Sequence, residues 1–580
     1  MSSTLTEPAT WVQSLRERLT GRLIAPTDPD YEAARTVVAG DVDAHPSAIA
    51  RVAGAADVAT VIAVARDHGL ELAVRSGGHD SAGNSTTDGG VVIDLRDMKR
   101  LEIDRDARTA WAETGLTAGE VVSAAAEQGL VIGFGDTGSV GLGGLTLGGG
   151  IGYLVRKHGM TIDNLLAAEI VTADGQHLRV DESAHPDLFW AIRGGGGNFG
   201  VATRFLFRLH PAEDFVGGIL VLPATADVVS GFMAASEAAP EELSTIANVM
   251  NCPPMPFVPE ENVGQIVVLA MLGWTGDRAA GERAMEPFRE LAPPIADLLK
   301  PMPYPEMFAA EEGDGEYRPK ATERTFFMDH VDGQAAQAMI DALSASDAPL
   351  RAVQLRVLGG AMARVPADAT AFAHRKAKIM AIVVSFFEDE TDFPARRKWV
   401  ADLAAALDQG VPGGYVNFIG DEGDAGVRRA YPPATLARLA AAKARYDPSN
   451  VFASTRTCPR RFERRMARAR EASPALLRGH LPPCFERWRL ALAPGAARAT
   501  EAAEWAGALV LIEHGTIDVD CQGGGFRRFV AGDLLALGWL PLKTIRNSGT
   551  QVARLVAVRR RGELSTRRRF ARVRRVSGLG

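Results

Sequence analysis

Three clusters of glycine constrain this chain more than any other feature of its sequence. They are the pair Gly77-Gly78, the run Gly138–Gly152 and the run Gly194–Gly200. Glycine at this density lets a backbone approach another group closely or make turns that need positive φ. The second run mixes Gly with Leu, whereas solvated linkers are rich in Gly and Ser without apolar residues. We therefore expect loops packed against a large flat ligand, and a tight turn in a barrel is the alternative.

The third cluster contains a formal match to GxGxxG, the dinucleotide fingerprint, at Gly195–Gly200. That motif follows a strand and opens a helix. Here the order is reversed, because a helical pattern at Pro186–Ile192 precedes the motif and a strand pattern at Val201–Leu209 follows it. A Rossmann NAD site is therefore disfavoured. The chain contains no GxxxxGK[ST], so a P-loop is excluded as well.

The first cluster belongs to Arg75–Asp80 (RSGGHD), which follows the strand expected at Leu72–Arg75. Two consecutive glycines let backbone N–H groups point at an anion such as a pyrophosphate. His79 would then lie beside the molecule that carries the phosphate. A histidine after a glycine pair is more often a turn residue, so the residues alone leave both interpretations open.

Three motifs in this order resemble a known family: RSGGHDSAG, GSVGLGGLTLGGGIGYLVRKHGMTIDN and DLFWAIRGGGGNFGV. They are similar to the FAD-binding domain of the vanillyl-alcohol-oxidase type. More narrowly, they resemble the berberine-bridge-enzyme-like FAD-linked oxidases and the bacterial 6-hydroxynicotine oxidases. The resemblance runs from about Val38 to Thr457 and includes Gly359–Arg375 and Ala434–Phe452.

The resemblance implies that FAD lies between two α+β subdomains. It implies that His79 is bonded to the flavin 8α-methyl group. Many relatives carry a second anchor, a cysteine, where this chain has Thr137, so a single attachment through His79 is predicted. The tail Ala453–Thr457 also departs from the family pattern. The implied FAD-binding residues are Arg75, Ser76, Gly77, Gly78, His79, Asp80, Gly138, Ser139, Val140, Gly143, Gly144, Asp163, Asn164, Gly197, Asn198, Gly200, Val201 and Asn417.

The resemblance further implies oxidation of an alcohol or amine C–H of a small molecule, by hydride transfer to the flavin. Tyr415 is the predicted catalytic residue, as base or as orienting donor, because relatives place tyrosines in this segment; Phe418 stands at the second such position. In similar plant enzymes a small residue near the position of Val140 goes with oxygen access, so the resemblance favours reoxidation by molecular oxygen to hydrogen peroxide. The alternatives are a dehydrogenase with another acceptor and a non-catalytic binding protein. Further candidate pocket residues are Tyr153, Trp274, Tyr304, Tyr317, Gln354 and Arg356.

The predicted fold class is α+β, with a two-subdomain PCMH-type FAD-binding domain, an antiparallel-sheet substrate domain and a small all-β cupin-like barrel. Strand patterns such as KIMAIVVSFFED alternate with amphipathic helical patterns after residue 210, which is typical of such a sheet. The predicted parts are an N-terminal helix and lead-in (1–40), the FAD-binding domain (41–212), the substrate domain (213–412), a segment returning to the flavin (413–458), a basic helical linker (459–505), the barrel (506–560) and a basic tail (561–580). Within these parts we expect the first helix at Trp11–Leu23, a strand at Tyr415 and an Arg-rich helix at Arg460–Arg470.

Charge is divided unevenly along the 580 residues. The segment Arg460–Gly580 holds 24 Lys+Arg and 10 Asp+Glu, a balance of +14, whereas the rest of the chain has a balance of −21. Such a division indicates a separate C-terminal module. Only His514 lies in the expected barrel, so a metal site there is disfavoured. The arginines are not interleaved with aromatic residues, so nucleic-acid stacking has no support.

The remaining sequence features bound the environment of the protein. The four cysteines show no CxxC or metal-ligand spacing, which favours a reducing cytosol over a disulfide framework. No apolar run reaches the roughly 18 residues of a membrane span, and no secretory signal is visible at the start. We therefore expect a cytoplasmic protein whose partners are a small substrate and oxygen. The sequence does not indicate an oligomeric state.

Overall fold

The structure is a computed structural model, and it describes residues 10–311, 318–420, 422–453, 485–500, 505, 508–521, 526–531, 533–535 and 542–560. The chain divides into two compact units, Met1–Cys458 and Pro459–Gly580. The Arg-rich helix expected at 460–470 and the basic tail lie outside the described residues.

The N-terminal part of the first unit is a four-stranded sheet in the order β1-β2-β4-β3, in which β4 is parallel to β2 and to β3. Apolar residues at helical spacing, among them Val58, Val61 and Ile62, bury one face of α3 against this sheet. The elements are α1 (Thr10–Arg18), β1 (Arg22–Ile24), α2 (Tyr31–Arg35), β2 (Ala48–Arg51), α3 (Ala55–Asp67), β3 (Leu72–Arg75) and β4 (Val91–Asp94).

A five-stranded antiparallel sheet follows, in the order β5-β6-β10-β8-β9. Alternate residues of β10, including Phe205 and Phe207, are buried, as expected for a strand with one face on a core. The elements are β5 (Leu101–Asp104), β6 (Thr109–Glu113), α4 (Ala118–Glu127), β8 (Leu165–Val171), β9 (His177–Val180), α7 (Pro186–Ala191) and β10 (Val201–Arg208); the short pair β7 (Leu130–Val131) and β11 (His210–Pro211) closes this part.

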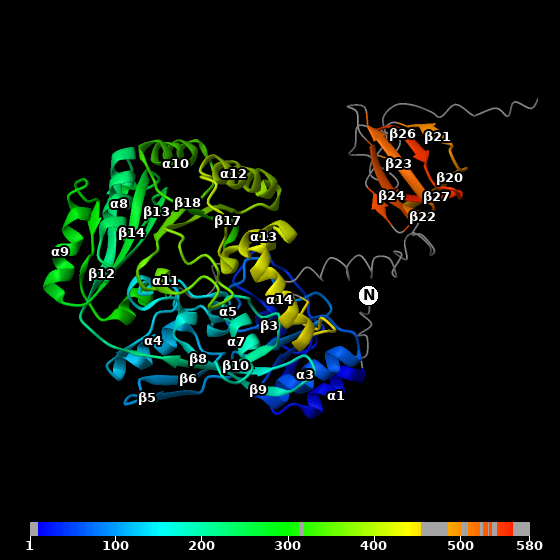
Figure 1. Ribbon diagram of the computed structural model, residues 1–580. Coiled ribbons are helices and arrows are strands. Elements are labelled where there is room, and N and C mark those ends of the chain that lie inside the picture. The colour runs from blue at the N-terminus through cyan, green and yellow to red at the C-terminus, as the bar shows by residue number, and fades with distance from the viewer. Residues whose placement is uncertain are drawn as a thin grey trace, which may run out of the picture. The chain divides into compact units, whose positions relative to one another are not determined.

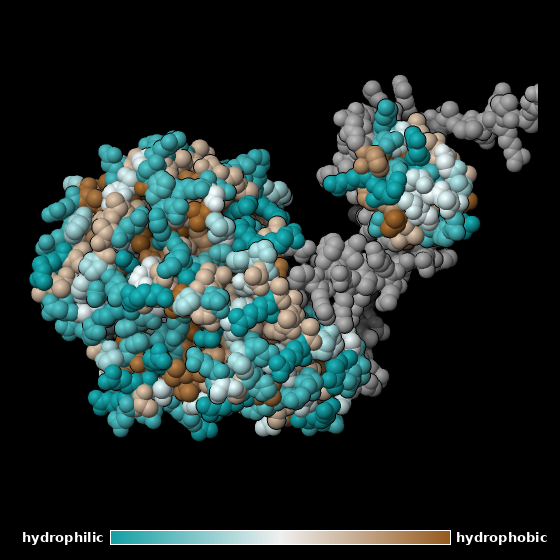
Figure 2. Space-filling model, in the orientation of Figure 1, coloured by the Kyte–Doolittle hydropathy of each residue, from teal (hydrophilic) through white to brown (hydrophobic). Residues whose placement is uncertain are grey.

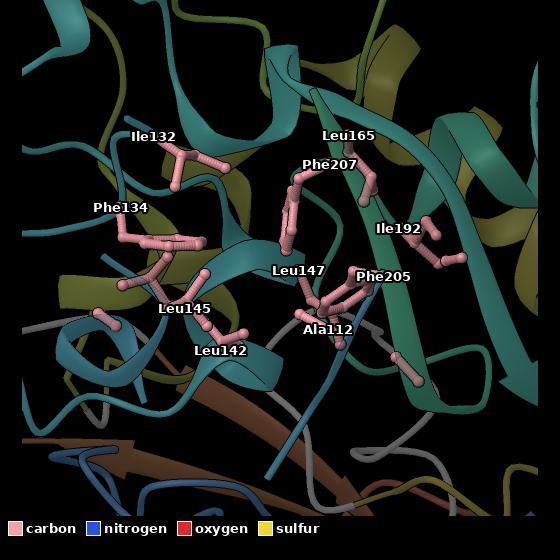
Figure 3. Close-up of a cluster of buried hydrophobic side chains, with 14 of the residues drawn as sticks. Ala112, Ile132, Phe134, Leu142, Leu145, Leu147, Leu165, Ile192, Phe205 and Phe207 are labelled. Carbon is pink, nitrogen blue, oxygen red and sulfur yellow. The ribbon is translucent and has the colours of Figure 1, made fainter. Parts of the chain in front are cut away.

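The glycine-rich run Gly138–Gly152 is not loop throughout, because Leu142–Gly148 forms helix α5. Its leucines supply the reason. Figure 3 shows Leu142, Leu145 and Leu147 in one buried cluster with Phe205 and Phe207 of β10. Burial of these side chains holds a helix that glycine alone would disfavour. Two short elements continue the chain, α6 (Val155–His158) and η1 (Thr161–Asp163).

The second half of the first unit is an eight-stranded sheet, which is the predicted antiparallel sheet. Helices α8, α10 and α12 gather along it, and α9 contacts β12 (Figure 1). The elements are β12 (Phe215–Pro223), α8 (Ala226–Ala238), β13 (Leu243–Asn251), η2 (Glu260–Asn262), β14 (Ile266–Thr275), α9 (Arg278–Arg289), β15 (Ala296–Asp297), β16 (Lys300–Pro301), η3 (Tyr304–Glu311), β17 (Lys320–Met328), α10 (Gly333–Ala345), β18 (Arg351–Val357), α11 (Gly360–Arg364), β19 (Ile379–Phe387), η4 (Glu390–Asp392) and α12 (Phe393–Ala406).

The chain then returns to the first half through η5 (Val416–Phe418), α13 (Gly423–Ala430) and α14 (Pro433–Tyr446). A buried lysine fixes the end of this return. Lys443, 1% exposed, donates hydrogen bonds to the backbone carbonyls of Asn198 (2.7 Å) and Phe452 (3.1 Å) and to the Asp447 carboxylate (2.6 Å). The third glycine cluster is thereby tied to Phe452.

Two expected elements differ from the structure. The helix predicted at Trp11–Leu23 ends at Arg18, because Gly21 approaches the backbone of Arg51 and the chain turns into strand β1. The strand predicted at Tyr415 is instead a 3₁₀ turn at Val416–Phe418. There the Tyr415 side chain accepts a hydrogen bond from the Gly150 backbone N–H, which fixes the segment without a strand partner.

The described strands of the C-terminal unit form two four-stranded sheets, β20-β27-β22-β25 and β21-β26-β23-β24. Trp505 and Ile512 lie in a shared core. The expected all-β character is present, but each sheet is open, so the described strands do not make a closed barrel. The strands are β20 (Phe485–Leu492), β21 (Ala497–Ala499), β22 (Leu509–His514), β23 (Thr516–Cys521), β24 (Phe526–Val530), β25 (Leu534–Leu535), β26 (Leu542–Asn547) and β27 (Ala553–Arg560).

The outer features of the described residues are simple. On the face of the first unit that Figure 2 shows, hydrophilic residues predominate and hydrophobic residues are scattered between them. Among the described residues, no helix is long and apolar enough to cross a membrane. The described residues also contain no group of three or more His, Cys, Asp or Glu side chains placed to hold a metal ion.

We predict that Lys443→Met lowers the free energy of unfolding by about 3–5 kcal/mol, because it leaves the fully buried Asp447 carboxylate without its ion pair. Urea or thermal denaturation of the purified protein measures this. Lys398→Met is the matched control, since Lys398 and Asp402 form the same i,i+4 pair on an exposed face, and the expected loss is below about 1 kcal/mol. Equal losses in the two variants would contradict the structural role of Lys443.

Candidate functional site

All three glycine clusters line one cavity of about 360 Å³ in the first unit. This volume lies within the range of small-molecule sites. The wall is built from the loop after β3, the run before and within α5, the start of β10 and the returning segment. Thirteen of the predicted site residues line it: Ser76, Gly77, Gly78, His79, Asp80, Val140, Gly143, Gly144, Gly197, Gly200, Val201, Tyr415 and Asn417.

The loop after β3 meets the second glycine cluster with no room for side chains. A Cβ on Gly77 would lie 2.4 Å from the Gly141 nitrogen, and a Cβ on Gly141 would lie 2.1 Å from the Gly77 nitrogen. The Ser76 hydroxyl donates to the Thr114 carbonyl (2.5 Å) and accepts from the Gly143 N–H (3.2 Å). The close approach of the two loops therefore requires glycine at both positions.

His79 is buried in the cavity wall. Burial lowers the pKa of His79 below its ordinary value, although a hydrogen bond from the ring to the Ser139 carbonyl acts in the opposite direction. The imidazole is therefore neutral at pH 7. With one ring nitrogen donating to Ser139, the other carries a lone pair, which is the requirement for a nucleophile or a hydrogen-bond acceptor.

Tyr415 lines the cavity from the returning segment. Its hydroxyl accepts hydrogen bonds from the Gly150 backbone N–H (2.8 Å) and the Asn417 amide (2.9 Å). Burial raises the pKa of Tyr415 to about 12, so the phenol stays protonated at neutral pH. Because two N–H groups already occupy its oxygen, its own proton is free to bond a ligand.

Asn417 fits closely against the second glycine cluster. Its amide donates to the Leu145 carbonyl (3.1 Å), and a Cβ on Gly148 would lie 1.8 Å from its oxygen. The returning segment thus contacts the end of helix α5 and the two glycines that follow it, between Leu145 and Gly150.

Six of the predicted FAD-binding residues do not belong to the cavity lining, although all six lie in the described part of the chain: Arg75, Gly138, Ser139, Asp163, Asn164 and Asn198. The lining also lacks five of the further pocket candidates, Tyr153, Trp274, Tyr304, Gln354 and Arg356, and the sixth, Tyr317, lies outside the described residues. Arg75, 1% exposed, turns toward the Asp94 carboxylate (2.9 Å) and the Ala34 carbonyl (2.6 Å). Gly138 lies against Phe308, since a Cβ there would be 3.2 Å from the Phe308 Cβ. Ser139 reaches the site only through its carbonyl, by the bond to His79.

The other three also make bonds within the protein. Asp163 accepts from the Arg375 guanidinium (2.8 Å) and caps the Met160 N–H (2.8 Å). The Asn164 amide donates to the carbonyls of His158 and Met160, and the Asn198 amide donates to the Gly195 carbonyl. The side chains of these residues stabilise the loops of the site; direct contact with a ligand stays a prediction for them.

The sequence analysis did not single out several residues of the wall. Asn84 and Ser85 follow the His79 loop, and the Ser85 hydroxyl is buried without a hydrogen-bond partner among the described residues. Asp136, Ile151 and Phe452 line the cavity as well. Asn84 and Ser85 could have been predicted from their place directly after the first motif. Asp136 is recognised only through its partner, which lies on a strand distant in the sequence.

The comparisons with known proteins agree with this geometry. Residues 46–181 match the family model described as an FAD binding domain. The (R)-6-hydroxynicotine oxidase of Paenarthrobacter nicotinovorans is 31% identical over 450 residues, which cover 74% of this chain and 95% of that protein. The crystal structure of 6-hydroxy-D-nicotine oxidase from Arthrobacter nicotinovorans is 28% identical, with a TM-score of 0.67 over 76% of this chain and 98% of that one.

Fold, cavity and sequence similarity thus define an FAD-binding oxidoreductase. The chain belongs to the family of FAD-linked oxidoreductases that includes (R)-6-hydroxynicotine oxidase. This confirms the resemblance drawn from the three glycine motifs, together with the predicted cofactor and the enzymatic character of the protein. Glucooligosaccharide oxidase of Acremonium strictum, described as carrying a 6-S-cysteinyl, 8α-N1-histidyl FAD, shares the fold, with 22% identity and a TM-score of 0.67 over 76% of this chain and 97% of that one.

The residues present fit FAD. A Cβ on Gly144 would meet no atom within 4 Å, so the backbone of α5 borders open space in the wall of the cavity. The charged side chains among the described lining residues are Asp80 and Asp136, both acidic. A pyrophosphate would therefore be held by backbone N–H groups of the glycine loops and by hydroxyls such as Ser85.

We predict that Gly144→Leu reduces FAD retention by at least about tenfold, because the new side chain occupies the cavity. The ratio of flavin to protein absorbance in the purified protein measures this, and circular dichroism checks the fold. Gly333→Leu is the matched control, since a Cβ on Gly333 at the start of α10 also meets open space but far from the lining. Unchanged flavin content in Gly144→Leu would show that FAD lies elsewhere.

Proposed function

We propose that the protein oxidises an alcohol or amine C–H of a small molecule and passes the electrons to molecular oxygen, with hydrogen peroxide as product. The observation that carries the proposal is a single cavity in which a neutral, buried imidazole and a protonated phenol share one wall with three glycine loops. Bound FAD supplies a two-electron acceptor for a hydride. The relative named as a 6-hydroxynicotine oxidase supports the oxidase class.

His79 is the proposed covalent anchor. Its unprotonated ring nitrogen is a competent nucleophile toward the flavin 8α position, and the Ser139 carbonyl fixes the orientation of the ring. Thr137, which stands where the resemblance places the cysteine of a second anchor, lines the same cavity. A threonine hydroxyl cannot form a thioether, so the attachment proposed is through His79 alone.

Tyr415 is proposed to orient the substrate. A phenol with a pKa of about 12 is almost entirely protonated at neutral pH, so it is poorly suited to accept a proton from the substrate. As a donor it is well placed, because Gly150 and Asn417 hold its oxygen and leave its proton for an oxygen or nitrogen of the substrate. Of the two roles predicted for Tyr415, orienting donor is therefore the one proposed here. Val140 lines the same cavity, and its small side chain supports the proposed access of oxygen.

The C-terminal unit has no proposed part in the chemistry. We infer that it is a cupin-like module, since its described strands pair into two facing sets around Trp505 and Ile512. Its function is a structural or partner-binding one in this proposal.

We predict that flavin stays with the wild-type polypeptide after acid denaturation and is lost from His79→Ala, because the only covalent bond runs through the imidazole. Flavin fluorescence of the protein band on a denaturing gel measures this. Thr137→Ala is the control and is expected to keep its flavin attached. Flavin released from the wild type would contradict the covalent bond, and flavin retained by His79→Ala would place it on another residue.

The oxidase activity itself is tested by anaerobic mixing with a panel of small alcohols, amines and sugars. Bleaching of the flavin by at least one compound, followed by return of the colour in air with one hydrogen peroxide per turnover, is the expected result. Bleaching without fast return in air would indicate a dehydrogenase. A protein that no compound of the panel bleaches would contradict the proposed reaction class.

A further inference from the structure

Asp136 places a carboxylate in the cavity wall that neither the flavin nor the predicted catalytic tyrosine accounts for. It follows strand β7, and one of its oxygens accepts a hydrogen bond from Arg356 Nη2 at 2.7 Å. Arg356 belongs to β18 of the eight-stranded sheet, so the pair joins the two halves of the first unit. The side chain of Arg356 is 5% exposed and that of Asp136 is 18% exposed.

The arginine is held from several sides. Its Nη1 donates to the Ile151 carbonyl (3.2 Å), and its Nε donates to the Gln354 side-chain oxygen (2.8 Å). Gln354 in turn donates to Asn248 (2.9 Å), and the Phe418 ring lies 5.3 Å from the guanidinium carbon. The guanidinium is therefore fixed behind the carboxylate, and its orientation sets that of Asp136.

The second carboxylate oxygen of Asp136, Oδ1, is left for a ligand. Within the part of the chain that the structure describes, Oδ1 has no hydrogen-bond partner. Because Oδ2 is turned to Arg356 while the residue lines the cavity, Oδ1 is the acceptor that a bound molecule meets. A preoriented acceptor of this kind contributes mainly specificity, since a ligand without a matching donor leaves it desolvated and unpaired.

The charge of the Asp136–Arg356 pair restricts which hydrogen-bond donors of a ligand can bind there. The Asp136 carboxylate is already balanced by Arg356, whose positive charge is almost fully buried. A cationic ligand would bring a second positive charge close to that guanidinium in a medium of low dielectric, where repulsion is strong. An uncharged O–H or N–H group needs only the acceptor and avoids this cost.

Tyr415 further restricts the class of ligand group that can bind Asp136. Its phenol donates into the same cavity. Its ring contacts the ring of Phe418 at a centroid distance of 5.2 Å, and the ring of Phe418 also faces Arg356. Burial is the main cause of the raised pKa of Tyr415, and the Asp136 carboxylate adds a smaller electrostatic contribution in the same direction. A substrate group that met both side chains would have to accept from Tyr415 and donate to Asp136, as a hydroxyl or a neutral amine can, whereas an ether only accepts and an ammonium only donates.

We propose that Asp136 is a substrate-binding residue that accepts a hydrogen bond from an uncharged hydroxyl or amine of the substrate, and thereby selects neutral alcohols or amines over ethers and cations. The proposal rests on the proposed function, because it assigns the substrate class of the same cavity. Arg356 is the positioning residue that holds the carboxylate.

The test uses phenol, anisole and phenyltrimethylammonium as probes on the flavin-loaded protein. These three share a ring and carry an O–H donor, an ether and a permanent cation. None has a C–H next to a hydroxyl or amine that could be oxidised, so perturbation of the visible flavin spectrum reports binding alone. We expect phenol to bind at least about tenfold more tightly than anisole or the cation, and this advantage to fall to within about threefold in Asp136→Asn.

Two further variants keep the result clear. Asp402→Asn makes the same chemical change on the exposed face of α12 and is expected to leave the preference for phenol intact. If Asp136→Asn does not fold because Arg356 loses its partner, Asp136→Asn combined with Arg356→Gln removes both charges, and the same loss of preference is expected.

The proposal is overturned if phenol binds no better than anisole to the wild type, if no probe changes the flavin spectrum, or if the preference survives in the Asp136 variants. A wild-type protein that carries no flavin would instead contradict the proposed function, and the visible spectrum before any probe is added separates that failure from the others.

Discussion

Two backbone segments meet at Gly77 and Gly141 so closely that any side chain would collide with the other backbone. This contact brings the loop after β3 against the run that leads into α5, and the other parts of the site depend on it. His79 follows Gly77 by two residues, and its ring reaches the carbonyl of Ser139 across the same contact. A wider separation of the two loops would remove both the hydrogen bond that orients the imidazole and the wall that the cofactor needs.

The polar groups of the cavity come from three different parts of the chain. The glycine loops contribute backbone and one neutral imidazole, with no cationic side chain among the described lining residues. The returning segment contributes a phenol, and the eight-stranded sheet contributes an arginine that acts only through Asp136. In the proposed function, backbone N–H groups bind the cofactor, and a few side chains at the junction of the two halves recognise the substrate.

Much of the site follows from sequence because glycine has a specific physical meaning. The strand at Leu72–Arg75 lies where its pattern indicated, and the three glycine clusters line one cavity, as the ligand interpretation requires. Arg75 shows where such reasoning ends. Its position in the motif is evident, but its direction depends on Asp94, a partner on the neighbouring strand that only the sheet order provides. The pairing of Asp136 with Arg356, 220 residues apart, is likewise a tertiary fact.

The return of the chain has a consequence for biosynthesis. Most of the cavity wall comes from residues 72–202, yet Tyr415, Asn417 and Phe452 complete it. At translation rates of about 5–20 residues per second, the 250 residues between Ala202 and Phe452 take roughly 12–50 seconds to make. Until then the wall lacks these three residues, so the complete cavity can form only after the ribosome has passed Phe452.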